Sequence, residues 1–127
     1  QTIFEETDVL SIHLPLSEET DYYVNKAFLS NFKKPIYLIN TARGNNVCLA
    51  DLVNGLKNKT VLGACLDVLE YETKSFETIN AEDLPEDFKY LTNAENVILS
   101  PHVAGWTKES YIKLSSFLAD KIQQRFN

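Results

Sequence analysis

Four short apolar runs, each followed directly by polar residues, constrain the fold of this chain most strongly. They cover residues 9–12, 35–39, 61–66 and 97–99 of the 127-residue sequence. Each run is largely apolar instead of alternating, which is typical of parallel strands covered on both faces. The sequence therefore predicts a parallel sheet of four strands.

Helical patterns separate and follow these runs. Asn25 can cap a helix over residues 26–31, and residues 49–57 place apolar side chains at spacings of three and four. This alternation of strands and helices predicts an α/β fold with right-handed crossovers. A long amphipathic helix is expected over residues 107–126, where a Thr cap precedes one apolar stripe, formed by Tyr111, Leu114, Leu118 and Ile122.

Charge and composition limit the class of function. With 44% hydrophobic residues the chain can form one domain core, over residues 1–106, to which residues 107–127 add the terminal helix. A net charge of −6 argues against a nucleic-acid groove, because phosphate binding needs clustered basic residues. No apolar run approaches the ~20 residues needed to span a bilayer, and the amino terminus has no signal-peptide pattern. We therefore expect a soluble cytoplasmic protein without membrane or nucleic-acid partners.

The two cysteines predict neither a disulfide nor a metal centre. Cys48 and Cys65 are seventeen residues apart, with no CxxC pair and no nearby histidine at ligand spacing. Cys65 lies within an apolar run and is expected to be a small buried side chain.

Residues 70–96 are the longest section without a clear period. The section is acidic, and a helical turn over residues 83–88, with Pro85 near its start, is the one element expected there. Loops of this length are usually functional or mobile, but for most of this section we favour a solvated acidic excursion over a binding loop.

Arg43 is one of two arginines in the chain and follows the second apolar run. In open parallel sheets, ligands bind beyond the carboxyl ends of the strands, where a guanidinium can grip a carboxylate with two parallel hydrogen bonds. A surface arginine that caps a turn is the alternative. Polar residues also follow the other runs, namely His13, Asp67 and His102.

Four motifs occur in order along the chain: HLPL at 13–16, NTARG at 40–44, GACLDVLEYE at 63–72 and SPHVAGW at 100–106. Over about residues 8–105 they resemble the carboxyl-terminal half of the nucleotide-binding domain of the D-isomer-specific 2-hydroxyacid dehydrogenases. The phosphoglycerate dehydrogenase-like branch is the most similar. The resemblance implies half of a Rossmann-like parallel sheet with flanking helices, a long terminal helix, and NAD as the cofactor.

The chain departs from the family pattern in two places. Its four glycines form no GxGxxG, so the pyrophosphate-binding turn is absent. In family members a substrate-binding domain and the first half of the cofactor domain precede the position of Gln1, and we therefore expect a fragment that is inactive by itself. Thr73 stands where the family usually has proline after the catalytic glutamate.

Oxidation of a 2-hydroxy acid needs a base for the hydroxyl proton, a group that orients this base, a clamp for the carboxylate and a hydride acceptor. His102 suits the first task, because an imidazole ordinarily titrates near neutrality. The resemblance supports this assignment, and it implies that Glu72 orients His102 and that Arg43 holds the carboxylate. Glu70 competes with Glu72, and the family's spacing of five residues after Asp67 favours Glu72.

The resemblance also implies contacts with the cofactor. Asp67 would accept a hydrogen bond from the nicotinamide carboxamide, and His13 would shape the cofactor groove. Trp106 would pack near the rim of the active site, with a substrate contact as the alternative. The expected cofactor-binding residues are Pro15, Thr20, Thr41, Ala42, Arg43, Asp67, His102, Ala104 and Gly105.

The predicted function is that of an oxidoreductase fragment whose parent protein transfers a hydride between NAD and a D-2-hydroxy or 2-oxo acid, with 3-phosphoglycerate as one candidate. The parent is expected to be a homodimer. The residue that would distinguish NAD from NADP precedes Gln1. A non-catalytic NAD-sensing or corepressor-like protein and a purely structural module are the alternatives, and the set of Arg43, Glu72 and His102 favours the enzyme.

Overall fold

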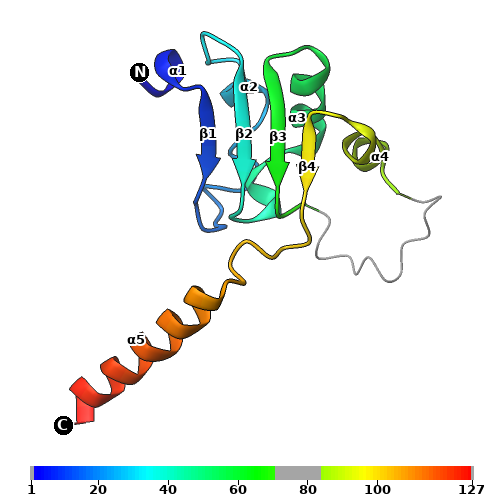
Figure 1. The fold of residues 1–127 in the computed structure, drawn as a ribbon. Helices are drawn as coiled ribbons and strands as arrows, with labels where there is room; N and C mark the ends of the chain where they lie inside the picture. Colours follow the sequence, from blue (N-terminus) through cyan, green and yellow to red (C-terminus); the bar gives the residue numbers. More distant parts are fainter. Residues whose placement is uncertain (1, 71–83, 127) are drawn as a thin grey trace.

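The computed structural model describes residues 2–70 and 84–126 and contains a four-stranded parallel sheet (Figure 1). The strands lie side by side in the order of the sequence. Their carboxyl ends are in register, since Asn40 pairs with Ile12 on one side and with Leu66 on the other. The strands are β1 (Val9–Ile12), β2 (Ile36–Asn40), β3 (Val61–Leu66) and β4 (Val97–Leu99). The predicted parallel α/β sheet is confirmed.

Six helical segments accompany the sheet within the described residues. The helix predicted over residues 49–57 is confirmed at both ends, and so is the Asn25 cap, because its side chain accepts a hydrogen bond from Phe28 N at 3.1 Å. The turn predicted near Pro85 is a helix of eight residues. The helical segments Thr2–Glu6 and Gly44–Asn46 were not predicted. The segments are α1 (Thr2–Glu6), α2 (Lys26–Leu29), η1 (Gly44–Asn46), α3 (Leu49–Lys57), α4 (Glu86–Asn93) and α5 (Lys108–Phe126).

Helices α2 and α3 cover one face of the sheet, and the opposite face is open in the described part of the chain (Figure 1). Right-handed crossovers that always move in one direction place their helices on the same side. Burial therefore alternates along the strands: Leu38 is fully buried, whereas Tyr37 is 50% exposed and Ile98 is 66% exposed. Within residues 2–70 and 84–126 the strands are thus covered on one face and not on both as expected, and Cys65 on the open face is only half-buried.

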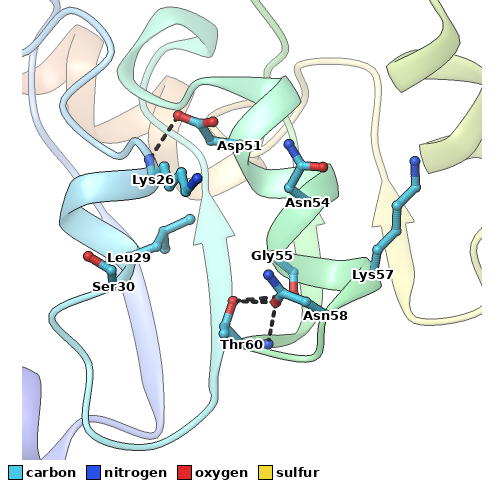
Figure 2. A pocket seen from close by; sticks show the side chains of 9 residues that line it. All are labelled: Lys26, Leu29, Ser30, Asp51, Asn54, Gly55, Lys57, Asn58 and Thr60. Carbon is cyan, nitrogen blue, oxygen red and sulfur yellow. Dashed lines mark hydrogen bonds between the residues drawn. The ribbon is translucent and has the colours of Figure 1, made fainter.

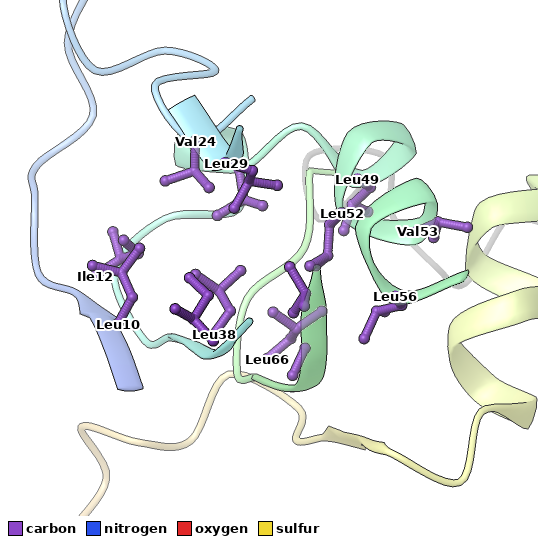
Figure 3. Close-up of a cluster of buried hydrophobic side chains, with 14 of the residues drawn as sticks. Leu10, Ile12, Val24, Leu29, Leu38, Leu49, Leu52, Val53, Leu56 and Leu66 are labelled. Carbon is purple, nitrogen blue, oxygen red and sulfur yellow. The ribbon is translucent and has the colours of Figure 1, made fainter. Parts of the chain in front are cut away.

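The core lies between the sheet and α3 (Figure 3). Leu38 of β2, Leu66 of β3 and Leu52 of α3 belong to one cluster, and none of them is more than 2% exposed. Leu91 extends this cluster to α4. Burying a leucine side chain contributes about 1.5–3 kcal/mol, so these contacts attach both helices firmly to the sheet.

Helix α5 carries the predicted apolar stripe but runs away from the sheet (Figure 1). Thr107 caps it as expected, because its Oγ1 accepts a hydrogen bond from Ser110 N at 3.1 Å. Leu114, Leu118 and Phe126 are 70%, 60% and 81% exposed, so no described residue covers the stripe. None of the described helices combines the length and the apolar character that a membrane span requires.

Gly44 lies where two backbone segments approach each other closely. A Cβ atom at this position would lie 2.0 Å from the carbonyl oxygen of Leu69 and 2.5 Å from Glu70 N. Both atoms belong to the backbone and cannot swing aside as a flexible side chain can. The turn after β2 therefore packs directly on the segment after β3.

We expect Gly44→Ala to destabilise the chain by about 1–3 kcal/mol, the usual effect of overpacking. Gly105→Ala is the matched control, because no atom lies within 4 Å of a Cβ at that position. Urea unfolding followed by circular dichroism measures both free energies of unfolding. Equal values for the two variants would contradict the close backbone approach at Gly44.

Candidate active site

Arg43, Asp67 and His102 follow three adjacent strands at one edge of the sheet. Arg43 comes three residues after β2, Asp67 comes directly after β3, and His102 comes three residues after β4. Since the strands are parallel, their carboxyl ends share this edge, where ligands bind in open α/β sheets. The structure thus brings three predicted site residues to one edge, while Glu72 lies outside the described residues.

Asn40 holds the turn that presents Arg43. Its side chain accepts a hydrogen bond from Ala42 N at 3.1 Å and donates one to Arg43 O at 3.0 Å. Asn40 is 1% exposed, and with both ends of its amide engaged it fixes the backbone between these residues. No sequence pattern had singled it out as a site residue.

Arg43 itself is exposed, and one of its guanidinium nitrogens donates a hydrogen bond to Ala42 O at 2.6 Å. A guanidinium carries five N–H donors, so most of them remain for other partners. Within residues 2–70 and 84–126 no carboxylate forms an ion pair with Arg43. The side chain is therefore suited to bind an anion.

Asp67 organises the turn that follows β4. Its Oδ1 accepts hydrogen bonds from Ser100 Oγ at 2.5 Å and from Val103 N at 2.9 Å, and its Oδ2 accepts one from Ala104 N at 2.9 Å. The backbone adds another bond, because His102 N donates to Asp67 O at 2.9 Å. These bonds tie residues 100–104 to the end of β3.

The hydrogen bonds outweigh the burial of the Asp67 carboxylate, which is 5% exposed. Burial alone would raise the pKa of this carboxyl, because it disfavours the charged form. Hydrogen bonds from Ser100, Ala104 and Val103, together with the charge of His102, act in the opposite direction, and the pKa of Asp67 lies below its usual value of 3.8. Asp67 is consequently ionised at neutral pH.

His102 has a left-handed backbone conformation, with a φ of 55°. This conformation is uncommon for residues other than glycine, although histidine adopts it more readily than most. It persists only where the surrounding structure holds it, and here the bonds to Asp67 hold the chain on both sides of His102. The imidazole is presented at an exposed position.

Glu70 has a structural role at helix α3. Its Oε2 accepts a hydrogen bond from Leu49 N at 3.1 Å. The first N–H groups of a helix have no partner within the helix, and the helix dipole favours a negative charge there. Cys48, the residue before α3, makes no capping hydrogen bond with its side chain. Glu70 is thus engaged at α3, which weakens its case as the partner of His102, and the role of Glu72 stays a prediction.

A pocket of about 130 Å³ lies beside Asp67, on the open face of the sheet. Its apolar wall includes Ile39 and Cys65, and Ser100 contributes to its polar side. Three of the predicted cofactor-binding residues line it, namely Thr41, Asp67 and Ala104. The other six lie in loops at the same edge without lining this pocket: Pro15, Thr20, Ala42, Arg43, His102 and Gly105.

The loop after β1 is held by its own hydrogen bonds. Thr20 Oγ1 donates to Pro15 O at 2.6 Å and accepts from Ser17 N at 2.8 Å. His13 Nε2 lies 2.8 Å from Ser11 Oγ, within hydrogen-bonding distance. These contacts shape the loop around Pro15 and Thr20, whereas the predicted contacts with the cofactor stay predictions.

A larger groove of about 560 Å³ lies between α2 and α3 (Figure 2). Lys26 and Asp51 lie at one end of it, where Asp51 accepts a hydrogen bond from Lys26 N at 2.8 Å. Asn58 and Thr60 lie at the other end. None of the predicted site residues lines this groove, so the smaller pocket beside Asp67 is the better candidate despite its size.

Three further residues considered in the sequence are the cysteines Cys48 and Cys65 and the single tryptophan, Trp106. Cys48 and Cys65 are free, and burial raises the pKa of the Cys48 thiol, which makes it a weak nucleophile at neutral pH. Trp106 is 71% exposed, so the packing expected for it is absent from the described part of the chain. Among the described residues no cluster of histidine, cysteine or acidic side chains could hold a metal ion.

Known proteins of one family are similar to this chain over most of its length. A family model described as "D-isomer specific 2-hydroxyacid dehydrogenase, NAD binding domain" matches residues 1–104. The glyoxylate reductase of Thermofilum pendens is 40% identical over 93% of this chain and 32% of its own length. The D-3-phosphoglycerate dehydrogenase of Bacillus subtilis is 33% identical over 98% of this chain and 21% of its own length. The NAD-complexed D-isomer specific 2-hydroxyacid dehydrogenase of Lactobacillus delbrueckii ssp. bulgaricus matches 98% of this chain and 38% of that structure, with a TM-score of 0.82 and 33% identity.

The chain therefore belongs to the D-isomer specific 2-hydroxyacid dehydrogenase family and matches part of its NAD-binding domain. This confirms the resemblance inferred from the four motifs, and a phosphoglycerate dehydrogenase is among the relatives. The chain spans between 21% and 38% of the length of the curated relatives that it matches.

Asp67→Asn is expected to remove part of the acid sensitivity of the fold. Because the folded pKa of Asp67 lies below the unfolded value near 3.8, the stability that it contributes is fully present above that value and is lost as the pH falls through the lower, folded value. The free energy of unfolding of the variant should therefore decrease less between about pH 5 and about pH 2 than that of the unaltered chain.

Urea unfolding at several pH values measures this difference. Asp120→Asn is the control, since it removes an exposed carboxylate on α5. The same acid sensitivity in both variants would contradict the lowered pKa of Asp67.

Proposed function

We propose that this chain forms one side of the active site in a longer NAD-dependent dehydrogenase of D-2-hydroxy acids and the corresponding 2-oxo acids. The observation that best supports this is the arrangement at the carboxyl edge of the sheet. There the turns that bear Arg43 and His102 lie at the ends of strands that flank β3 and Asp67. An exposed guanidinium and an exposed imidazole at one edge match the two needs of such a substrate, which carries a carboxylate and a reacting hydroxyl.

In this proposal Arg43 binds the substrate carboxylate through two parallel hydrogen bonds, which a planar guanidinium can form and an ammonium cannot. His102 takes the hydroxyl proton during oxidation and returns it during reduction. Glu72, outside the described residues, is proposed to orient the imidazole and to stabilise its charged form. When bound, NAD supplies the hydride acceptor.

The proposed contacts with NAD centre on the pocket beside Asp67. Its apolar wall suits the flat nicotinamide ring, and Asp67 Oδ2 has one hydrogen-bond donor among the described residues, which leaves capacity for a carboxamide N–H. Thr41 and Ala104 line the same pocket. Since no GxGxxG is present, we propose that the pyrophosphate is held by residues outside this chain, which by itself would bind NAD weakly and be inactive.

We also propose substrates, a location and an assembly for the longer protein. The names of the relatives make glyoxylate and 3-phosphoglycerate candidate substrates. We further propose a cytoplasmic homodimer without membrane or nucleic-acid partners, in agreement with the net charge of −6. Residues 1–106 are proposed as part of the NAD-binding domain, and residues 107–127 as its terminal helix.

In the longer protein, we expect His102→Ala to lower kcat by about 10²-fold or more, because the group that donates the proton during reduction is lost. Arg43→Lys should raise the KM for the 2-oxo acid and also lower kcat, because lysine lacks the planar fork. The rate of NADH oxidation with glyoxylate, pyruvate or 3-phosphohydroxypyruvate gives both parameters.

The second arginine of the chain supplies the control for this experiment. Arg125 is exposed on α5, and Arg125→Lys should leave both parameters unchanged. Near-normal turnover in the His102 variant would refute its role in proton transfer. Equal effects of the two arginine replacements would refute the role of Arg43 as a carboxylate clamp.

A further inference from the structure

The turn that carries His102 depends on side-chain contacts instead of regular secondary structure. It follows β4, a strand of three residues, and precedes α5, which begins at Lys108. His102 lies in this turn with a φ of 55°. A left-handed residue with a Cβ atom is disfavoured unless its neighbours hold it, so the contacts of this turn decide where the imidazole points.

Ser100 provides the hydroxyl contact of this turn. Its Oγ donates a hydrogen bond of 2.5 Å to Asp67 Oδ1, and its backbone N donates one of 3.0 Å to Leu66 O. A short O–H···O bond to an ionised carboxylate is about twice as strong as one between neutral groups. Ser100 is therefore fixed to the end of β3 through both its side chain and its backbone, two residues before His102.

The same carboxylate also holds the chain on the other side of His102. Val103 N shares Oδ1 with the Ser100 hydroxyl, and Ala104 N donates to Oδ2, both at 2.9 Å. Removing the hydroxyl would leave Oδ1 with one donor among the described residues. Because Asp67 is buried and ionised, its carboxylate would then shift or admit water, and the amides of the turn would shift with it.

We propose that Ser100 is a positioning residue which, through the carboxylate of Asp67, fixes the left-handed turn that presents His102 to the substrate. This inference rests on the proposed function for the role of His102 in turnover. In this proposal Asp67, for which the resemblance implies a cofactor contact, has a second role as the anchor of that turn. The hydroxyl is engaged with Asp67 and acts on His102 through that carboxylate.

Two variants of Ser100 in the longer protein test this role. Ser100→Ala removes the hydroxyl, and kcat should fall by about tenfold to 100-fold, the effect of a small misplacement of a catalytic group. Ser100→Thr keeps a hydroxyl at the same place and should retain most of kcat.

Hydrogen exchange gives a readout that does not depend on activity. The amides of His102, Val103 and Ala104 should exchange faster in Ser100→Ala and at the normal rate in Ser100→Thr. Ser30→Ala is the matched control, because Ser30 Oγ also donates to an oxygen, Ala27 O at 2.8 Å, but at the end of α2. It should change neither kcat nor the exchange of these three amides.

The outcomes separate this inference from the proposed function. A wild-type kcat in Ser100→Ala would overturn the positioning role, and so would equal losses in the Ala and Thr variants or a loss of kcat without faster exchange in the turn. If the unaltered protein turns over no 2-oxo acid, the proposed function fails, and the exchange rates alone then decide whether Ser100 holds the turn.

Discussion

The buried carboxylate of Asp67 is the interaction on which the arrangement of the carboxyl edge depends. A buried charge is strongly unfavourable unless donors surround it. Among the described residues, the donors to this carboxylate all come from the five residues that follow β4. Those residues include a serine hydroxyl and two backbone amides. The path of the chain between β4 and α5 is consequently set by one side chain at the end of the neighbouring strand, and the position of His102 is set by that path.

The turn after β2 is held in a comparable way from the other side. Asn40 closes the turn with its side chain and also accepts a hydrogen bond from Asp67 N through its carbonyl oxygen at 3.0 Å. Gly44 lets this turn pack on the backbone after β3, and Glu70 connects that same segment to the start of α3. The turns that bear Arg43 and His102 therefore share a common support, which is the chain segment from Asp67 to Glu70.

Much of the fold could be predicted because it follows from local periodicity. Continuous apolar runs gave all four strands, and apolar spacings of three and four gave Leu49–Lys57 with both ends correct. Helix α4 was predicted only as a turn, because just three of its eight residues, Phe88, Tyr90 and Leu91, have apolar or aromatic side chains. Coverage of one face only could not be predicted from the runs, since their composition does not record what packs on them.

The positions of the site residues could be predicted, but their supports could not. Arg43, Asp67 and His102 were marked by residue type at the ends of strands. The donors to Asp67 lie 33 to 37 residues further along the chain, and two of them are backbone amides that no side-chain pattern reveals. Asn40 and Ser100 both stand inside the recognised motifs, as the first residues of NTARG and SPHVAGW, and that position was the available indication of their importance.

We propose that the edge formed by Arg43, Asp67 and His102 binds the reacting acid. A crystal structure of the longer protein with NADH and oxamate, an unreactive analogue of a 2-oxo acid, tests it most directly. We expect the oxamate carboxylate to lie on the Arg43 guanidinium and its carbonyl oxygen to lie within hydrogen-bonding distance of the His102 imidazole, with Asp67 still bonded to the turn. Oxamate bound away from Arg43 and His102, or Asp67 released from residues 100–104 in the complex, would contradict it.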